Sequence, residues 1–95
     1  MEHVGKFEWH LEKAQKNALK HGVEFDEAAN TFFDPKFIRS SDKKHSDTER
    51  RYIGLGMSYK GRLLTVVFTE RNGVIRIISA RIANKKERAI YEQKS

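Results

Sequence analysis

RLLTVVFTERNGVIRIISA, residues 62–80, carries the strongest structural signal in the chain. Two largely apolar runs, at 62–70 and 74–80, flank the dipeptide Asn72-Gly73. Asn-Gly favours a two-residue turn in which both residues take positive φ, the turn that best joins two twisted strands. Both runs carry apolar side chains on both faces, which is typical of strands covered on both sides or paired in a dimer. The stretch therefore predicts a tight antiparallel hairpin in the middle of one sheet.

The regions on either side of the hairpin add one strand and one helix. A strand is predicted over 51–57, after a wholly polar run at 40–48 that is typical of an exposed loop. After the hairpin, Asn84 is followed three residues later by Glu87, close to a capping box, and this predicts a short helix over about 85–93. We expect the main apolar contacts of that helix to come from Ala89 and Ile90.

The first third of the chain predicts a short strand at residues 7 and 9 and two helices. The first helix should run from Leu11 to His21 with an apolar stripe of Leu11, Ala14, Ala18 and Leu19. Gly22 should end it as a left-handed cap. The second helix should begin with Asp26 as its N-cap and run to about Phe33, before Asp34-Pro35 stops it.

Together these elements predict a single domain, residues 1–95, of the α+β class. Its antiparallel sheet should carry the two N-terminal helices packed on one face, followed by a short C-terminal helix. The chain is 38% hydrophobic and has no cysteine, which allows a modest core and excludes disulfides and thiolate sites. Neither a signal-like N-terminus nor an apolar run of membrane-spanning length is present, so we expect a cytoplasmic protein without membrane contact.

The net charge of +6 is concentrated in the second half of the chain. Residues 1–47 carry eight Lys and Arg against nine Asp and Glu, whereas residues 48–95 carry eleven against four. Seven of the eight arginines lie in that second half. Such a basic region predicts a polyanionic partner, either a nucleic acid or an acidic protein that occupies the same surface.

Neither metal nor cofactor chemistry is expected from the motifs. No two of the four histidines stand four residues apart, and the chain has no P-loop, no GxGxxG and no serine in a nucleophile elbow. RNA cleavage without a metal remains: the 2′-hydroxyl attacks its own phosphate, and the protein supplies a base, an acid and cations. The catalytic candidates are Arg76, Arg81, Arg62, His45, Glu49 and Tyr91. The expected substrate-binding residues are Arg51, Lys20, His21 and Arg88.

Arg76 and Arg81 are the favoured phosphate clamps because a guanidinium offers a planar fork of donors. Their spacing is odd, so an unbroken strand would turn them to opposite faces. They can converge only if the strand ends or bulges near Ser79-Ala80. Each candidate also has a purely structural interpretation: surface arginines on an edge strand, a solvated loop histidine, or Tyr91 as the packing anchor of a short helix.

Several segments together resemble the BrnT family of bacterial type II toxins. They cover residues 7–91 in order: FEWHLEKAQKNALKHGVEFDEAANTFFDP, DKKHSDTERRYIGLG, GRLLTVVFTER and RIISARIANKKERAIY. The chain departs from the family pattern at His10, where an acid usually follows the tryptophan, and at Ile82, where a basic residue often follows the SAR block.

The resemblance implies a RelE-like fold and metal-independent RNA cleavage that arrests translation and growth. It also implies a BrnA-type antitoxin, which neutralises the toxin and binds DNA through a ribbon-helix-helix region, with a homodimer or a hetero-oligomer as possible assemblies. The alternative is a non-catalytic module whose basic sheet face only binds nucleic acid or an acidic partner. A toxin acting on something other than RNA is a third interpretation.

Overall fold

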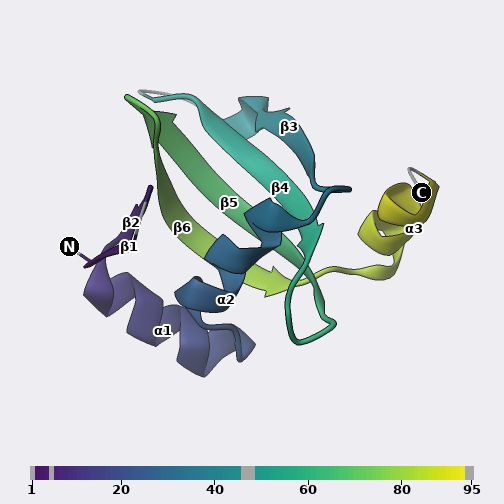
Figure 1. Cartoon of the computed structure of the whole chain (residues 1–95), viewed down its shortest axis with the longest axis horizontal. Coiled ribbons are helices and arrows are strands. Elements are labelled where there is room, and N and C mark those ends of the chain that lie inside the picture. The colour runs from purple at the N-terminus through teal and green to yellow at the C-terminus, as the bar shows by residue number, and fades with distance from the viewer. Residues whose placement is uncertain (1, 5, 46–48, 94–95) are drawn as a thin grey trace.

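The computed structural model describes residues 2–4, 6–45 and 49–93, with the backbone alone for residues 2–4 and His45. The described part forms one six-stranded sheet in the order β1-β2-β6-β5-β4-β3 (Figure 1). The strands are β1 Glu2–Val4, β2 Phe7–Trp9, β3 Ile38–Asp42, β4 Arg51–Met57, β5 Leu63–Arg71 and β6 Val74–Ile82. The helices are α1 Leu11–His21, α2 Phe25–Asn30 and α3 Lys85–Gln93, with short 3-10 segments at Thr31–Phe33 and Lys43–His45.

The predicted hairpin is confirmed. β5 and β6 are antiparallel and occupy the middle of the sheet. The turn residues Asn72 and Gly73 both have positive φ, at 53° and 79°, as a type I′ turn requires. The α+β class is confirmed as well, since the helices and the strands segregate into separate layers.

Four of the five pairings between described strands are antiparallel, and β2 with β6 is parallel. The sequence predicted an antiparallel sheet of fewer strands. β2 can join in parallel because the chain between it and β6 is long enough to include the crossover that such a pair needs. The polar run at 40–48 is also corrected, because β3 continues through Asp42 before a 3-10 turn at Lys43–His45. Residues 46–48 of that run lie outside the described part.

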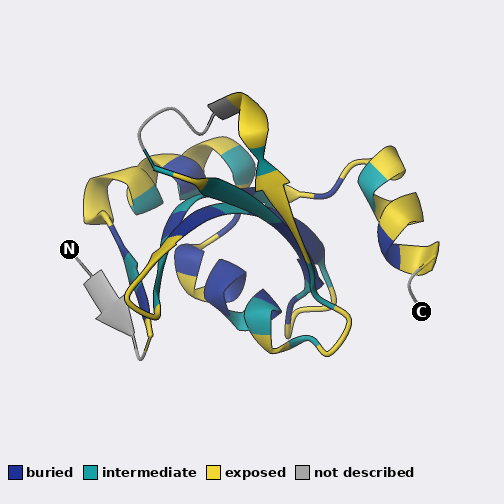
Figure 2. Ribbon diagram, turned by 90° about the horizontal axis from the view of Figure 1, so that it is seen from above, coloured by how far each residue is buried: buried dark blue, intermediate teal, exposed yellow. Residues whose placement is uncertain are grey.

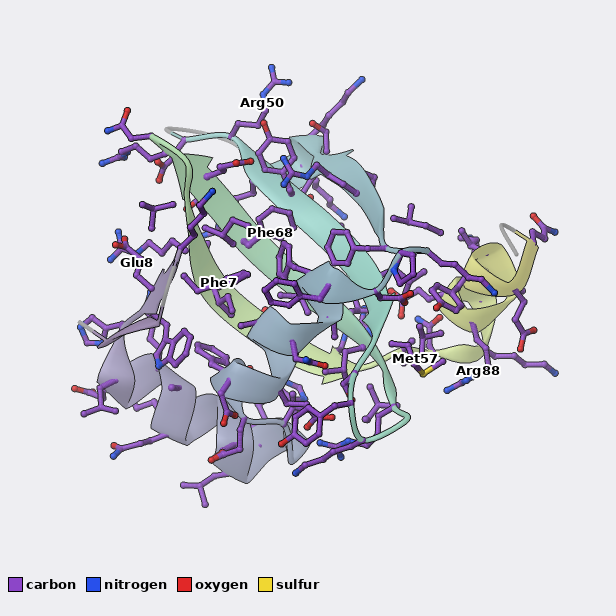
Figure 3. The ribbon with its side chains drawn as sticks, viewed as in Figure 1. Phe7, Glu8, Arg50, Met57, Phe68 and Arg88 are labelled. Atoms are coloured by element: carbon purple, nitrogen blue, oxygen red, sulfur yellow. The ribbon has the colours of Figure 1, made fainter. Side chains whose placement is uncertain are left out.

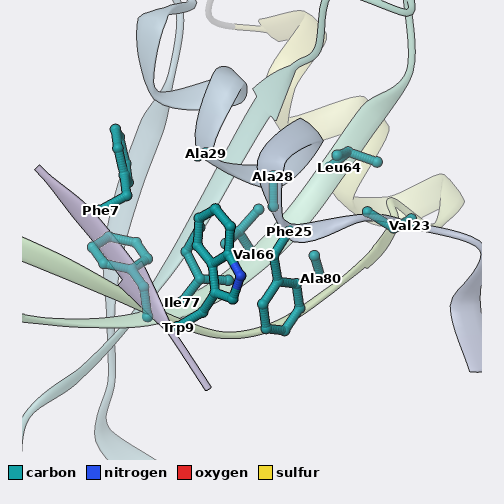
Figure 4. Close-up of a cluster of buried hydrophobic side chains, with 11 residues drawn as sticks. Phe7, Trp9, Val23, Phe25, Ala28, Ala29, Leu64, Val66, Ile77 and Ala80 are labelled. Atoms are coloured by element: carbon teal, nitrogen blue, oxygen red, sulfur yellow. The ribbon is translucent and has the colours of Figure 1, made fainter. Parts of the chain in front are cut away.

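The main core lies between α2 and one face of the sheet (Figure 4). α2 buries Phe25, Ala28 and Ala29. The facing side chains of β5 are Leu64, Val66 and Phe68, each fully buried. α2 begins two residues earlier than predicted: Glu24 is its N-cap and Asp26 lies in its first turn. The helix starts at Phe25, whose side chain is buried in the core. This packing outweighs the preference of Asp26 for the N-cap position.

The apolar stripe predicted for α1 is wrong in part, because Leu11 and Leu19 are 50% and 89% exposed. The buried residue of this helix is Asn17. Helix α1 packs against β6 just beyond the last residue that pairs with β2 (Figure 1). The open strand edge there presents backbone polar groups, which must find a partner when they are buried.

Asn17 supplies that partner. Its amide nitrogen donates to the carbonyl oxygens of Ala80 at 2.8 Å and Val23 at 3.0 Å, and its oxygen accepts the Ala80 N–H at 3.1 Å. The side chain thus extends the hydrogen-bond ladder of β6 in place of a strand. Gly22 ends the helix in the left-handed conformation, at φ 69°, as predicted.

On the opposite face of the sheet, α3 packs at one end. Tyr91 of α3 packs with Leu55, Leu63 and Ala83. Most of α3 is exposed (Figure 2). The predicted contact residues Ala89 and Ile90 are exposed instead of buried, because the helix turns its tyrosine toward the sheet. The capping box is confirmed, since Asn84 and Glu87 exchange hydrogen bonds of 2.8 and 2.9 Å.

We expect Asn17→Ala to lower the free energy of unfolding by about 1–3 kcal/mol, because it leaves buried backbone groups of β6 without a partner. Urea denaturation of the purified variant measures this. Gln15→Ala is the matched control: Gln15 is an exposed amide on the same helix, and its loss should change stability by less than about 0.5 kcal/mol. Equal stability of the two variants would contradict the role given to Asn17.

Candidate functional site

A β-bulge in β6 brings the two favoured arginines to the same face of the sheet. Arg81 pairs with Thr65, and Arg76 pairs with Thr69. The register shifts between Val67 and Phe68, so that Ile78 is an extra residue in β6. Thr65 and Thr69 are four residues apart on one strand and share a face. Arg76 and Arg81 therefore share that face, and the predicted bulge near Ser79-Ala80 is confirmed one residue away. We call this surface, opposite α2, the arginine face.

On that face Arg81 is held by Glu87 of α3. Its Nη1 and Nη2 donate to the two carboxylate oxygens of Glu87, both at 2.8 Å. Glu87 also accepts from the Thr65 hydroxyl at 2.9 Å and from the backbone N–H of Asn84. The hydrogen bonds from Arg81, more than those from Asn84 and Thr65, lower the pKa of Glu87 to about 2 against the effect of burial. Arg81 thus fastens α3 to the sheet.

Arg76 is in a different position, because no described residue forms a hydrogen bond or an ion pair with it. It is half-buried and lines a hollow of about 210 Å³ beside the β5–β6 turn. We call this the hairpin hollow; its lining residues are Glu8, Glu49, Thr69, Arg71, Asn72, Val74 and Arg76. A partly desolvated arginine without a carboxylate partner is available for an anionic ligand.

The hairpin hollow combines positive and negative side chains. Arg71 donates to Glu49 Oε2 from Nε at 3.1 Å and from Nη2 at 2.6 Å. Glu8 of β2 pairs in register with Arg76 of β6. The structure therefore places two of the predicted residues, Arg76 and Glu49, in one hollow.

Glu8, Thr69 and Arg71 also line this hollow, although no pattern in the sequence indicates them as site residues. The alternation of strand 7–9 shows that Glu8 turns away from Phe7 and Trp9, which are buried in the core. It does not show which strand lies beside Glu8. That neighbour follows from the parallel pairing of β2 with β6, which no local pattern indicates.

Arg62 lies with the α2 side of the structure rather than with Arg76. Its Nε donates to Oε2 of Glu27 at 2.9 Å, its Nη2 donates to the other carboxylate oxygen, and it also reaches the Gly22 carbonyl at 3.1 Å. Glu27 is fully buried and also accepts from the Ser58 hydroxyl. Hydrogen bonding to Arg62 lowers the pKa of Glu27 although burial opposes this. Breaking such a buried pair is strongly destabilising, which indicates a structural role for Arg62.

Tyr91 is placed in the small core under α3. Its hydroxyl donates to Asp34 Oδ2 at 2.5 Å. Burial, together with this hydrogen bond, raises the pKa of Tyr91 to about 12. The Tyr91 ring packs in this small core while its hydroxyl is held by Asp34. This contact fits the structural interpretation of Tyr91 as the packing anchor of α3.

The remaining candidates are dispersed. Lys20 is exposed and His21 half-buried at the end of α1. Arg51 begins β4 opposite Asp42 and turns to the arginine face. Arg88 is exposed on α3, on the opposite side of the molecule from Glu8 (Figure 3). The side chain of His45 lies outside the described part.

Two further findings concern the described residues as a whole. No three of the described His, Asp and Glu side chains gather as a set that could hold a metal ion. Among the helices of the described ranges, none has the length and apolarity needed to cross a bilayer.

Comparison with known proteins gives a family and a fold. The family model described as "Ribonuclease toxin, BrnT, of type II toxin-antitoxin system" matches residues 9–87. A search of curated proteins returned no match. Among solved structures, the chain is similar to the 1.1 Å crystal structure of the Brucella abortus ribonuclease toxin BrnT. The TM-score is 0.62 at 21% identity, over 86% of this chain and 100% of that one.

The Arg81–Glu87 pair should make stability depend on pH in the acid range. The folded pKa of Glu87, about 2, lies below its ordinary value of 4.5. Its contribution to the free energy of unfolding is therefore complete above pH 4.5 and is lost as the pH falls toward 2. Between pH 5 and 2.5, wild type should lose about 1–2 kcal/mol more than Glu87→Gln, once solvent screening is allowed for.

Urea unfolding at the two pH values measures this difference. Glu12→Gln removes an exposed carboxylate that pairs with Lys16 and should leave the wild-type pH dependence in place. If Glu87→Gln lost as much stability as wild type over this range, the ion pair would not be what fastens α3.

Proposed function

The chain belongs to the BrnT family of ribonuclease toxins of type II toxin–antitoxin systems, and on this premise we propose that it is a metal-independent endoribonuclease. It cleaves RNA through attack of the 2′-hydroxyl on the adjacent phosphate and so inhibits translation and growth. A BrnA-type antitoxin, which binds DNA through a ribbon-helix-helix region, neutralises it. The site of cleavage is the hairpin hollow on the arginine face.

The observation that carries this proposal is the half-buried Arg76 in the hairpin hollow, which has no hydrogen-bond or ion-pair partner among the described residues. As the 2′-oxygen attacks, negative charge grows on the two non-bridging oxygens of the phosphate. The fork of a guanidinium matches these two oxygens and can donate a hydrogen bond to each. Donors that are already in place stabilise the transition state without reorganisation, and this is commonly the largest contribution to catalysis.

Arg71 provides a second positive charge at the same hollow. Two of its guanidinium nitrogens donate to Glu49, so the carboxylate fixes the direction of the side chain while other N–H groups stay available. In this proposal Glu49 positions Arg71 and Arg76 holds the scissile phosphate. Arg81 has a different task, because both of its outer nitrogens are occupied by Glu87.

The distribution of charge supports the nucleic-acid substrate and the partner. An excess of positive charge confined to residues 48–95 favours binding of any polyanion. An acidic, mostly helical segment of the antitoxin would cover the arginine face and keep RNA from it. Binding at this face should weaken as salt is added, and more so for RNA than for the antitoxin, because RNA releases condensed counterions when its phosphates are neutralised.

Substitution of Arg76 tests its proposed role as the phosphate clamp. Arg76→Ala should lower the rate of RNA cleavage about 10²–10³-fold, because a transition-state hydrogen-bond donor is lost. Arg76→Lys should recover only part of it, because an ammonium lacks the fork. Cleavage of an end-labelled RNA in the presence of EDTA measures both. Lys86→Ala removes the same charge from an exposed position on α3, on the other side of the molecule from β2 (Figure 1), and should stay near the wild-type rate.

Circular dichroism must show that each variant is folded. A folded Arg76→Ala protein that cleaves as fast as Lys86→Ala would remove Arg76 from the site. Wild-type protein that binds RNA but never cuts it would instead favour the non-catalytic alternative.

Co-expression tests the proposed antitoxin partner. Expression of this chain alone should arrest bacterial growth, and co-expression of the open reading frame next to its gene should restore growth. Plating efficiency measures this, and co-purification of the two proteins tests for a complex. The clamp variant Arg76→Ala should be non-toxic and should still bind the neighbouring protein. Arrest that persists in the presence of every adjacent reading frame would contradict the proposed antitoxin.

A further inference from the structure

Glu8 lies directly beside Arg76, the proposed phosphate clamp. They are register partners on the adjacent parallel strands β2 and β6. Both line the hairpin hollow. Side chains of directly opposed residues on neighbouring strands stand on the same face of the sheet, about 5 Å apart at their base. The Glu8 carboxylate and the Arg76 guanidinium therefore line one hollow side by side.

No described residue forms a hydrogen bond or an ion pair with the Glu8 side chain, nor with that of Arg76. Opposite charges on opposed residues would ordinarily close into a salt bridge. Here the two groups stand separately at the edge of the hollow, so that each can contact a ligand placed between them. The other carboxylate of the hollow, Glu49, is occupied by Arg71.

We propose that the Glu8 carboxylate is the proton acceptor for the attacking 2′-hydroxyl, an inference that rests on the ribonuclease function proposed above. In the transition state the attacking oxygen and the non-bridging oxygens are bonded to the same phosphorus. One acceptor and one donor that lie side by side can contact both kinds of oxygen at once. Glu8 and Arg76 match this requirement in chemistry and in placement.

The reaction step balances without any further reactant except water. The 2′-hydroxyl proton passes to a Glu8 carboxylate oxygen as the bond from the 2′-oxygen to phosphorus forms. The bond from phosphorus to the 5′-oxygen breaks, and that oxygen takes a proton from water. The products are a 2′,3′-cyclic phosphate and a free 5′-hydroxyl, and Glu8 returns its proton to solvent.

The charged groups around Glu8 are few. Arg76 faces it from β6, and Glu49 and Arg71 share the hollow. On β1 its register partner is His3, whose side chain lies outside the described part. Because Glu8 acts as a base only when it is ionised, cleavage should be slower in acid than at neutral pH.

Glu8→Gln tests the proposal, because glutamine keeps the shape of the side chain and cannot accept the proton. We expect the cleavage rate to fall about 10²–10⁴-fold, the usual contribution of a positioned base. The acid limb of the plot of kcat/KM against pH should disappear. Glu24→Gln, which alters an exposed carboxylate at the start of α2, should keep both the rate and the pH profile of wild type.

Binding of a non-cleavable oligonucleotide that carries 2′-deoxyribose separates a base from a positioning residue. Glu8→Gln should bind it as tightly as wild type or more tightly, because a negative charge near the phosphate is gone. Arg76→Ala should bind it more weakly. Glu8→Asp, in case the glutamine variant does not fold, should be slower than wild type and should retain the acid limb.

The outcomes separate this inference from the function beneath it. A Glu8→Gln protein that cleaves at the wild-type rate, or cleaves slowly with the acid limb intact, would overturn the role of Glu8 and leave the ribonuclease standing. Wild-type protein that cuts no RNA at any pH would overturn both.

Discussion

The bulge at Ile78 controls which side of the sheet each half of β6 presents. On the turn side of the bulge, Ile77 enters the core under α2 and Arg76 turns away from it. On the other side, Ala80 enters the core and Arg81 turns away. A regular strand would send one of the two arginines into the apolar layer, where an unpaired guanidinium is very costly. One extra residue thus serves the core and the arginine face at once.

This constraint explains how much the sequence could predict. The hairpin is set by Asn72-Gly73 and two apolar runs, all local, and the chain folds accordingly. The cap pair Asn84 and Glu87 is likewise local and correct. Where the bulge lies depends on packing across β5, and the sequence could indicate only that the two arginines require one.

The errors have a shared physical origin. Leu11 and Leu19 looked like core residues because apolar residues at helical spacing usually are, yet α1 meets a strand edge, which needs the polar Asn17 more than leucines. Ala89 and Ile90 were expected to anchor α3, but the anchor is Tyr91, which buries more surface and finds Asp34 for its hydroxyl. In both cases a polar group is buried because it has a specific hydrogen-bond partner: Ala80 for Asn17 and Asp34 for Tyr91. Long-range partners of this kind cannot be found from spacing.

Hydrogen-bond partners likewise distinguish Arg62 and Arg81 from Arg76. Arg62 and Arg81 each meet a carboxylate that is fully or mostly buried, and these pairs join α2 and α3 to the sheet. From the sequence, Arg62, Arg76 and Arg81 are equivalent in charge, and all three lie in or directly beside the predicted hairpin strands. In the structure Arg76 stands apart, since it is half-buried and unpaired among the described residues. Desolvating such a cation gains the protein no stability, and the neighbouring Glu8 carboxylate also has no partner among the described residues. The RNA site proposed above would account for both.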